Sequence, residues 1–297
     1  ILVDGCTLTA EKGIVVTTDN SLTIYAQSGG TGTLNATGVF FRNGATYESN
    51  ASAGIGGSGT APDSGAITIH GGVINATGDG QSGYCSSAGI GGGTPSSGNG
   101  GSSGAVIILG GTVTANSGEG FVAGAGIGGG GSQQGAGGTG DNITIYGGSV
   151  TAASTGTQYG GAGIGGGGGK NGGTGSNIQI YGGTIKATGS SSGAGIGGGG
   201  STSSLNSSYK SGDGAVTISG GTVTAVGGNY AAGIGGGGGY YYSTQYASGG
   251  CTGGTGSVTI SGGIVDASSP TEVAWEGYEG APIGNGGNTT AAATVNK

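Results

Sequence analysis

Short segments of alternating hydrophobic and polar residues return along the chain with a long period. Residues 142–146 and 149–152, for example, carry an aliphatic residue at every second position. Alternation with a period of two predicts half-buried β-strands, and no segment has the period of an α-helix. A third segment, the string Ala-Gly-Ile-Gly at residues 125–128, precedes these two in its repeat. The pattern therefore predicts three short strands in each repeat.

The Ala-Gly-Ile-Gly string sets the length of the repeat. Successive copies lie 32 to 38 residues apart, and the last, degenerate copy follows after 49 residues. The isoleucines of these copies are Ile55, Ile90, Ile127, Ile164, Ile196, Ile234 and Ile283. A repeat of this size is typical of a solenoid, in which each unit buries its apolar face against its neighbours.

A pair of glycines, such as Gly147-Gly148, joins the two alternating segments of most repeats. Glycine adopts positive φ without steric cost, so each pair predicts a tight corner. The other two connections vary in length and predict loops. Three strands for each turn, with one fixed corner, predict an all-β fold: a parallel β-solenoid, or triangular β-helix, of about seven to eight rungs with long Gly/Ser/Tyr-rich loops.

Strand alternation assigns the residues that face the core. One predicted wall has inward aliphatic residues at Ile67, Ile69, Ile143, Ile145, Ile178, Ile180, Val216 and Ile218. A second has Val113, Ala115, Val150, Ala152, Ile185 and Ala187, and the isoleucines of the Ala-Gly-Ile-Gly string line the third.

The organisation predicted along the chain has three parts. Residues 1–50 form lead-in rungs and a cap, in which we expect the irregular insert at 39–49 to cover the open end of the core. Residues 51–267 form the repeat solenoid. Residues 268–297 form a C-terminal cap and tail, with a linker from Asn288 onward. A distinct terminal unit is expected because the ends of a solenoid have no neighbouring repeat.

Composition narrows the classes of function. Of 297 residues, 86 are glycine and only 6% are charged, and the net charge is −7. With one arginine and five lysines there is no basic patch, which argues against nucleic-acid binding. The chain has no apolar run of about 18 residues, the length that would predict a membrane-spanning helix. Because the chain starts at Ile1 and has no methionine, we expect a mature or excised part of a longer precursor.

The three cysteines, Cys6, Cys85 and Cys251, occupy non-equivalent positions far apart in the repeat array. A disulfide has a short reach, so Cys85 and Cys251 cannot meet within one solenoid. Two interpretations stay open, namely small unpaired side chains and pairing between molecules.

The string Ala-Gly-Ile-Gly-Gly-Gly, followed by Val-Thr-Ile-Ser-Gly-Gly-Thr-Val-Thr-Ala at residues 216–225, resembles a known group of sequences. These are the glycine-rich repeat regions of secreted or wall-attached β-helix surface proteins of Gram-positive gut bacteria. The resemblance covers about residues 22–287. It implies an extracellular or cell-surface location, and it brings no catalytic motif to this chain.

No residue pattern predicts a catalytic or metal site. His70 is the only histidine, and its equivalents in other repeats are Tyr25, Leu109, Tyr146, Tyr181, Ser219 and Ser261, which is the variation of a solvent-facing position. A polysaccharide lyase needs clustered carboxylates and a positioned base, whereas the thirteen acidic residues are scattered. Residues 137–141 resemble half of a calcium-binding rung, but Ser176 and Ser257 replace Asp141 in the neighbouring repeats. We therefore predict no metal and no cofactor.

Tyrosines supply the candidate ligand-binding residues: Tyr240, Tyr241, Tyr242 and Tyr246 in one Ser/Gly-rich loop, with Tyr146 and Tyr181. Tyrosine on such loops offers a large contact area and adaptable hydrogen bonds. The partners expected are host or environmental glycans or cell-surface proteins. The alternative is that loop tyrosines, including Tyr159, Tyr209 and Tyr230, fold down and cover the side of the solenoid.

Two further surfaces have alternative interpretations. A strand wall whose outward residues are glycine, such as Gly126 and Gly128, lets another backbone approach closely. That backbone belongs either to another chain, which would give self-association, or to the chain's own glycine loops, which is the favoured interpretation. The pair Thr112/Thr114 recurs as Ser149/Thr151 and Thr222/Thr224, as in an ice-binding array, although Lys186 and Asp266 interrupt it.

The sequence thus favours a non-catalytic extracellular β-solenoid that serves as a stalk, fibre or surface adhesin. The alternatives are a carbohydrate-binding module that uses the Tyr-rich loops, a β-helix enzyme similar to a polysaccharide lyase, and an ice-binding protein.

Overall fold

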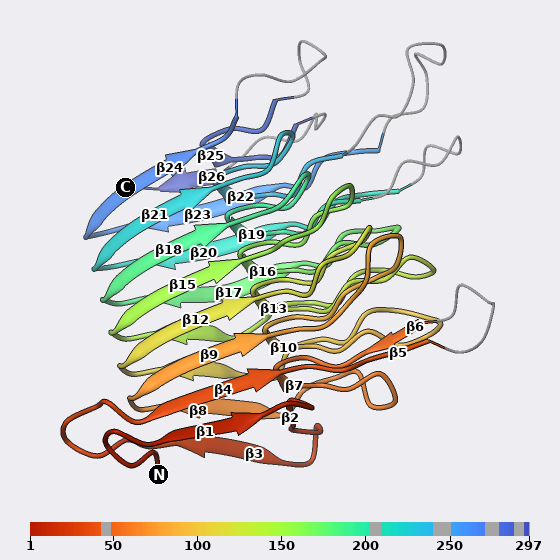
Figure 1. Cartoon of the computed structure of the whole chain (residues 1–297). Coiled ribbons are helices and arrows are strands. Elements are labelled where there is room, and N and C mark those ends of the chain that lie inside the picture. Colours follow the sequence, from red (N-terminus) through yellow and green to blue (C-terminus); the bar gives the residue numbers. More distant parts are fainter. Residues whose placement is uncertain (43–48, 202–208, 240–250, 271–278, 288–293, 297) are drawn as a thin grey trace.

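The computed structural model describes residues 1–42, 49–201, 209–239, 251–270, 279–287 and 294–296. The chain winds through eight stacked rungs, and each rung contributes one strand to each of three parallel eight-stranded sheets (Figure 1). The predicted all-β parallel β-solenoid is confirmed, and the described residues contain no helix.

The first sheet holds the alternating strands that follow the Gly-Gly corners. Its strands, in spatial order, are β1 (Thr7–Ala10), β4 (Thr33–Thr37), β9 (Val73–Thr77), β12 (Thr112–Asn116), β15 (Ser149–Ala153), β18 (Thr184–Thr188), β21 (Thr222–Val226) and β24 (Ile264–Ser268).

The second sheet holds the Ala-Gly-Ile-Gly strands, and each of its strands is only two residues long. They are β2 (Ile14–Val15), β7 (Ile55–Gly56), β10 (Ile90–Gly91), β13 (Ile127–Gly128), β16 (Ile164–Gly165), β19 (Ile196–Gly197), β22 (Ile234–Gly235) and β25 (Ile283–Gly284).

The third sheet holds the alternating strands that precede the corners. They are β3 (Ser21–Ile24), β8 (Ala66–Ile69), β11 (Val106–Ile108), β14 (Ile143–Ile145), β17 (Gly175–Ile180), β20 (Gly214–Ile218), β23 (Gly256–Ile260) and β26 (Thr294–Asn296).

The core consists of columns of aliphatic side chains, one from each rung. The ladder register places Ile145 directly on Ile108 and Ile180, and Ile127 directly on Ile90 and Ile164. The side chains of these six residues are fully buried, as are those predicted to face inward in the first sheet. Burying one such side chain contributes about 1.5–3 kcal/mol of folding free energy. The columns therefore offset the conformational entropy that a glycine-rich chain loses when it folds.

The corners between the third and first sheets form as predicted. The second glycine of each Gly-Gly pair, as in Gly111, Gly148 and Gly183, has φ between 88° and 95°. A side chain is strained in this region of φ, which explains why glycine occupies the position. The corner keeps the two long sheets at a constant spacing along the whole solenoid.

A layer of glycines covers the second sheet, and each strand of that sheet ends in glycine in most rungs. Gly128 has φ 137°, and a Cβ atom there would lie 1.9 Å from the carbonyl oxygen of Gly165 on the next strand. Outside the strands of the second sheet, glycines that follow a strand alternate with glycines of the loop that leads to the third sheet. The backbone N–H of each of these glycines after the first donates a hydrogen bond to the carbonyl oxygen of the glycine before it in the column, at 2.8–3.0 Å. This glycine column is Gly93, Gly101, Gly130, Gly138, Gly167, Gly173, Gly199, Gly212, Gly237, Gly254 and Gly286.

All eleven residues of the glycine column are buried, and so are Gly126 and Gly128 beneath them. Of the two interpretations of the glycine wall, cover by the chain's own loops is the one found. The close approach requires glycine, because a Cβ atom on Gly138 would lie 1.8 Å from the carbonyl oxygen of Gly101.

The two ends of the chain differ from the prediction. The described part of the insert forms an antiparallel hairpin, β5 (Phe40–Arg42) and β6 (Ser49–Ala51), and the Phe40 ring contacts Tyr84 with centroids 5.7 Å apart. Tyr84 lies in the loop between β9 and β10, so this part of the insert packs beside the third rung and not over the open end. At the other end, Thr294–Asn296 pairs with β23, so these residues complete the last rung where a linker was predicted.

Candidate functional site

A column of side chains projects from the corner that follows the third sheet. It contains one residue from each of seven rungs: Tyr25, His70, Leu109, Tyr146, Tyr181, Ser219 and Ser261. Six of them come directly before the Gly-Gly pairs, Tyr25 comes before Ala26, and all seven are the outward residues predicted from the sequence. All seven are exposed, and we refer to them as the corner column.

Rings in the corner column stack on one another because each rung repeats the position of the last. Tyr146 and Tyr181 lie with ring centroids 5.0 Å apart and ring planes within 9° of parallel. Tyr25 and His70 stack at 4.2 Å. About half of each tyrosine side chain stays accessible, 53% for Tyr146 and 47% for Tyr181. The ring edges therefore form an apolar ridge along the corner.

Beside Tyr181, three side chains form a hydrogen-bonded chain across the outer face of β17. The Tyr181 hydroxyl donates to Oε1 of Gln179, and Nε2 of Gln179 donates to Oδ1 of Asn177, both at 2.5 Å. The Asn177 amide then donates to Oδ1 of Asn142 on the previous rung at 2.7 Å. We refer to Tyr146, Tyr181, Asn142, Asn177 and Gln179 as the amide–tyrosine patch.

Local backbone geometry positions the two asparagines. Asn142 and Asn177 have φ of 58° and 53°, a left-handed conformation that asparagine tolerates better than most residues. The amides were missed as site residues in the sequence analysis. The signal for them is the spacing of 177, 179 and 181, which puts three polar side chains on one face of a strand.

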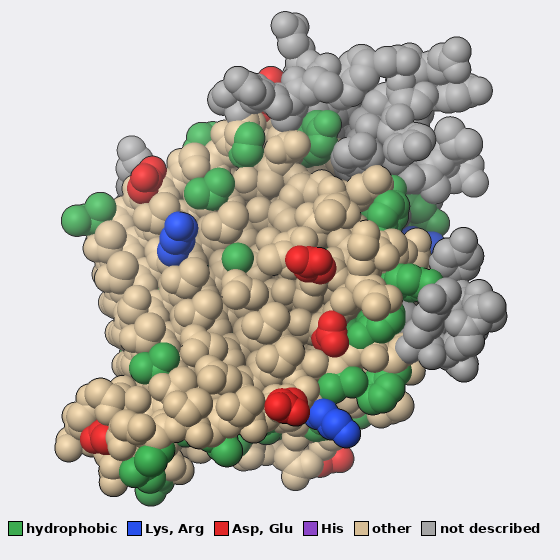
Figure 2. Space-filling view, viewed as in Figure 1, with side chains coloured by type: hydrophobic (Ala, Val, Ile, Leu, Met, Phe, Trp, Pro, Cys, Tyr) green, Lys and Arg blue, Asp and Glu red, His purple; other side chains and the backbone are tan. Residues whose placement is uncertain are grey.

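The face that carries the patch is uncharged. Along the described part of the third sheet, the outward positions are occupied by Ser, Thr, Ala, Ile, Asn, Gln, Tyr, Leu and His. Charged side chains are also few on the face that Figure 2 displays. An uncharged surface rich in amides, hydroxyls and tyrosine rings can bind a neutral polar ligand through hydrogen bonds and apolar contact.

The loop tyrosines divide into two groups. Tyr159 and Tyr230 are buried, with 8% and 7% of their surface accessible, so they cover the side of the solenoid. Tyr159 packs edge-to-face on Phe121 with centroids 5.0 Å apart. The predicted ligand-binding residues Tyr240, Tyr241, Tyr242 and Tyr246 lie outside the described residues. Only Tyr146 and Tyr181 of the predicted site are therefore placed, and they lie together.

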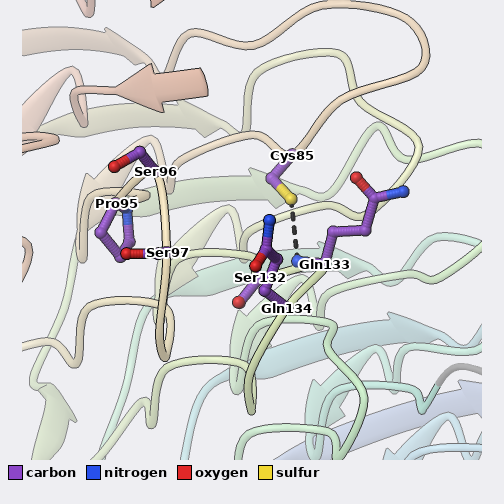
Figure 3. Close-up of a pocket in the computed structure, with 7 residues that line it drawn as sticks. All are labelled: Cys85, Pro95, Ser96, Ser97, Ser132, Gln133 and Gln134. Carbon is purple, nitrogen blue, oxygen red and sulfur yellow. Dashed lines mark hydrogen bonds between the residues drawn. The ribbon is translucent and has the colours of Figure 1, made fainter. Parts of the chain in front are cut away.

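A small pocket adjoins Cys85 at the loop side of the solenoid (Figure 3). Its enclosed volume is about 10 Å³, room for no more than about one water molecule, and its walls come from residues 95–97 and 132–134. Small-molecule sites usually span roughly 300–1,000 Å³. Burial raises the pKa of the Cys85 thiol to about 12, although the Gln133 N–H donates to its Sγ at 2.9 Å. A thiol protonated at neutral pH is a poor nucleophile, so Cys85 is not suited to nucleophilic catalysis.

The cysteines lie on different rungs. Cys6 is exposed before β1, whereas Cys85 and Cys251 are buried in loops of the third and seventh rungs. Rungs rise by about 4.8 Å, so four rungs separate the two buried thiols by roughly 19 Å, beyond the reach of a disulfide. Burial also raises the pKa of Cys251.

Acidic residues connect successive rungs. Asp63 and Asp141 accept hydrogen bonds from the backbone N–H groups of Ser102 and Ser176 on the next rung, at 2.7 and 2.9 Å. The Asp141 carboxylate thus takes part in rung stacking at the position that resembles half of a calcium site. Among the described residues, no three His, Cys, Asp or Glu side chains gather closely enough to hold a metal ion.

Asp213 makes the most extensive of these connections. Its Oδ1 accepts from the Thr255 N–H at 2.7 Å and from the Thr255 hydroxyl at 2.8 Å, and its Oδ2 lies 2.9 Å from Nζ of Lys210. Partial burial raises the pKa of this carboxyl, but the hydrogen bonds from Thr255 and the Lys210 charge outweigh burial and hold the pKa below its usual 3.8.

We expect Asp213→Asn to reduce the acid sensitivity of the fold. A carboxyl whose pKa is lower in the folded state stabilises that state above about pH 4 and loses this contribution as the pH falls through the folded pKa. Since the pair is about half exposed, the loss at pH 7 is expected to be below about 1 kcal/mol. Urea unfolding at pH 7 and pH 3 should show the difference between wild type and variant shrinking at pH 3. The control Asp19→Asn, in an exposed loop, should show no such change.

The threonine array of the first sheet has the register predicted for it. Thr112, Ser149, Thr184 and Thr222 lie in one outward line, and exposed Lys186 interrupts the neighbouring line of threonines. Ice binding by this face stays a prediction.

No described segment is a helix with the length and hydrophobicity required to span a bilayer.

Comparison with known proteins adds one finding. A family model described as a beta helix repeat matches residues 28–59, 67–94, 106–131, 143–168, 178–200 and 216–238, which together make up more than half of the chain. Five of the six matches run from a strand of the third sheet, through the first sheet, to the glycine layer, so the repeat unit of the family corresponds to one rung. Searches of curated proteins and of solved structures found no match.

Proposed function

This chain belongs to the beta helix repeat family, and from this premise we propose that it is a non-catalytic extracellular solenoid that serves as a stalk, fibre or adhesin segment. The observation that carries the proposal is the unbroken core. Inward aliphatic columns run from the second to the seventh rung with almost no accessible surface. Eight rungs at about 4.8 Å spacing form a rod roughly 35 Å long.

The rod is stiff for a reason that suits a surface role. Every rung is tied to the next through three hydrogen-bonded ladders. The glycine column adds to these from the third rung onward, and side chains such as Asp63 and Asp213 add to them between individual rungs. Such a structure transmits a mechanical load along its axis without a hinge. The likeness of residues 216–225 to surface proteins of Gram-positive gut bacteria supports an extracellular location on a cell of that kind.

Two assays test this role. The chain, displayed on a bacterial cell without adhesins of its own, should raise the number of cells retained under flow on mucin or on epithelial cells. Unchanged retention would contradict adhesion. Incubation of the purified chain with plant and mucin polysaccharides should release no new reducing or unsaturated ends, and their release would show a polysaccharide-cleaving enzyme instead.

The amide–tyrosine patch supports a second candidate function, the binding of neutral glycans. Sugar hydroxyls both donate and accept hydrogen bonds, and the side-chain amides of Asn142, Asn177 and Gln179 offer both kinds of partner. The ridge of Tyr146 and Tyr181 offers an apolar edge to the C–H groups of a sugar ring. The absence of charge around the patch, among the described residues, favours an uncharged glycan.

We expect Tyr181→Ala and Gln179→Ala each to weaken glycan binding about tenfold, which corresponds to about 1.4 kcal/mol. The matched control is Thr217→Ala, because Thr217 occupies the register of Gln179 one rung later. Binding would be measured on a glycan array and then by calorimetry with the best neutral glycan. A variant without residues 240–246 separates the contribution of that loop from the patch. Equal binding by all variants would exclude the patch.

A further inference from the structure

The corner column is straight through the middle rungs of the solenoid. His70, Leu109, Tyr146 and Tyr181 follow four successive strands of the third sheet, β8, β11, β14 and β17, which pair in register. Figure 1 shows the corners after these strands one above another in a nearly straight line. All four corners lie within the described residues. We refer to these four side chains as the corner ridge, and the ridge runs parallel to the solenoid axis.

The corner ridge offers apolar contact at regular intervals. Leu109, Tyr146 and Tyr181 have 42%, 53% and 47% of their surface accessible, so each keeps about half of its side chain open to a ligand. Successive ridge residues lie about 4.8 Å apart, and the four together extend over roughly 14 Å. A pyranose sugar in an extended chain advances by nearly the same distance. One sugar can therefore lie over each rung.

Hydroxyl and amide groups flank the corner ridge on both sides. On the third sheet, Thr144 and Gln179 are the outward residues two positions before Tyr146 and Tyr181. On the first sheet, the residues that follow the Gly-Gly pairs are exposed Thr112, Ser149 and Thr184, in one line. A ligand on the ridge thus has hydrogen-bonding partners along its length, and these flanking residues are uncharged.

The shape of the corner distinguishes a ligand that lies along the ridge from one that crosses it. A crossing ligand passes from the third sheet to the first, where the surface turns, and it contacts one or two rungs only. A ligand parallel to the axis stays on a straight line and contacts a new ridge residue at every rung. A straight ligand therefore gains the most contact area when it is bound lengthwise.

Resting on the proposed glycan-binding function, we propose that the ligand is a straight, neutral polysaccharide with equatorial 1,4 linkages, bound lengthwise along the corner ridge. Such linkages, as in a β-1,4-glucan, keep a chain extended, whereas the axial linkage of an α-1,4-glucan curves the chain away from a straight line. Each sugar packs its C–H groups on one ridge residue. Its hydroxyls bond to the flanking hydroxyl and amide side chains.

Oligosaccharides of increasing length test lengthwise binding. Calorimetry would use the glucose series from cellobiose to cellohexaose and the corresponding β-1,4-linked mannose and N-acetylglucosamine series. In at least one series, affinity should rise with each added sugar and level off at about four, the number of rungs in the ridge. The tetrasaccharide should bind at least about tenfold more tightly than the disaccharide. Maltohexaose, a glucose hexamer with the curved linkage, is the matched control ligand and should bind no better than cellobiose.

Variants that shorten or lengthen the ridge test its role directly. Leu109→Ser installs the residue that Ser219 provides at the same position of the column. It should weaken binding of the hexasaccharide about fivefold and leave the disaccharide unchanged. Ser219→Tyr extends the ridge by one rung and should strengthen hexasaccharide binding by a similar factor. The matched control Thr224→Tyr adds the same ring on the first sheet, away from the ridge, and should bind like wild type.

The outcomes separate this inference from the function on which it rests. Equal affinity for disaccharide and hexasaccharide, equal binding of maltohexaose and cellohexaose, or no gain from Ser219→Tyr would overturn lengthwise binding and leave glycan binding intact. Absence of binding to every glycan would overturn both. Deglycosylated mucin that binds as strongly as native mucin would show that the ridge takes a polypeptide, and this result would also contradict the proposal.

Discussion

Replacing Gly138 with alanine is expected to lower the free energy of unfolding by about 4 kcal/mol, which is at the upper end of single-substitution effects. Gly138 lies in the middle of the glycine column, where a Cβ atom would sit 1.8 Å from the carbonyl oxygen of Gly101. The obstacle is backbone, so no side-chain rotation can relieve it. The two loop segments must separate, which breaks the hydrogen bonds from Gly138 to Gly130 and from Gly167 to Gly138.

Thermal unfolding followed by circular dichroism would measure this effect, with a decrease in melting temperature of about 10 °C expected for a chain of this size. The matched control is Gly71→Ala. Gly71 is the first glycine of a corner, and a Cβ atom there meets only the Cβ of Ala26 at 3.6 Å, an ordinary contact. The control should change stability by less than about 0.5 kcal/mol. Equal effects of the two substitutions would show that the glycine column is not closely packed.

The sequence was sufficient to predict the three walls because their information is local and repeated. Alternation in residues such as Ile143 and Ile145 identifies both a strand and its inward face, and the Gly-Gly pairs identify the corner. The glycine column was not predicted, because the two residues that pair in it, such as Gly130 and Gly138, are joined by loops of different lengths in each repeat. A run of glycines gives no sign of which members come together.

The candidate site was predicted only in part for a related reason. Tyr146 and Tyr181 stand out as aromatic residues at one position of the repeat, and the structure stacks them. The amides of Asn177 and Gln179 look like ordinary outward strand residues until the register places Asn142 beside them. The last strand, β26, was also missed, since a three-residue Thr-Val-Asn segment has little to distinguish it from a tail.

Stiffness and recognition have a common origin in this fold. A position that repeats once for each rung forms a column, whether it faces the core or the solvent. The inward columns make the rod, and the outward columns place identical or similar groups about 4.8 Å apart along it. A surface organised in this way suits an extended ligand that contacts several rungs, and any change that displaces one rung also disrupts the column on its outer face.

Replacing Ile108 with alanine is expected to lower the free energy of unfolding by about 2–5 kcal/mol. Ile108 is fully buried between Ile69 and Ile145 in the column of the third sheet. The cavity left by the substitution cannot close, since strands on both sides hold the rung at a fixed height. Urea unfolding at equilibrium would measure the loss.

The adjacent residue provides a control that shares the chemistry and the strand. Ile107 points outward and is partly exposed, so Ile107→Ala is expected to cost less than about 1 kcal/mol. Equal costs at positions 107 and 108 would contradict the assignment of the inward face. In a linear array each rung is supported only by its neighbours, so Ile108→Ala should also raise amide hydrogen exchange most in the second to fourth rungs. A uniform increase along the chain would instead indicate that the solenoid unfolds as a single cooperative unit, with the interfaces between rungs stronger than the rungs themselves.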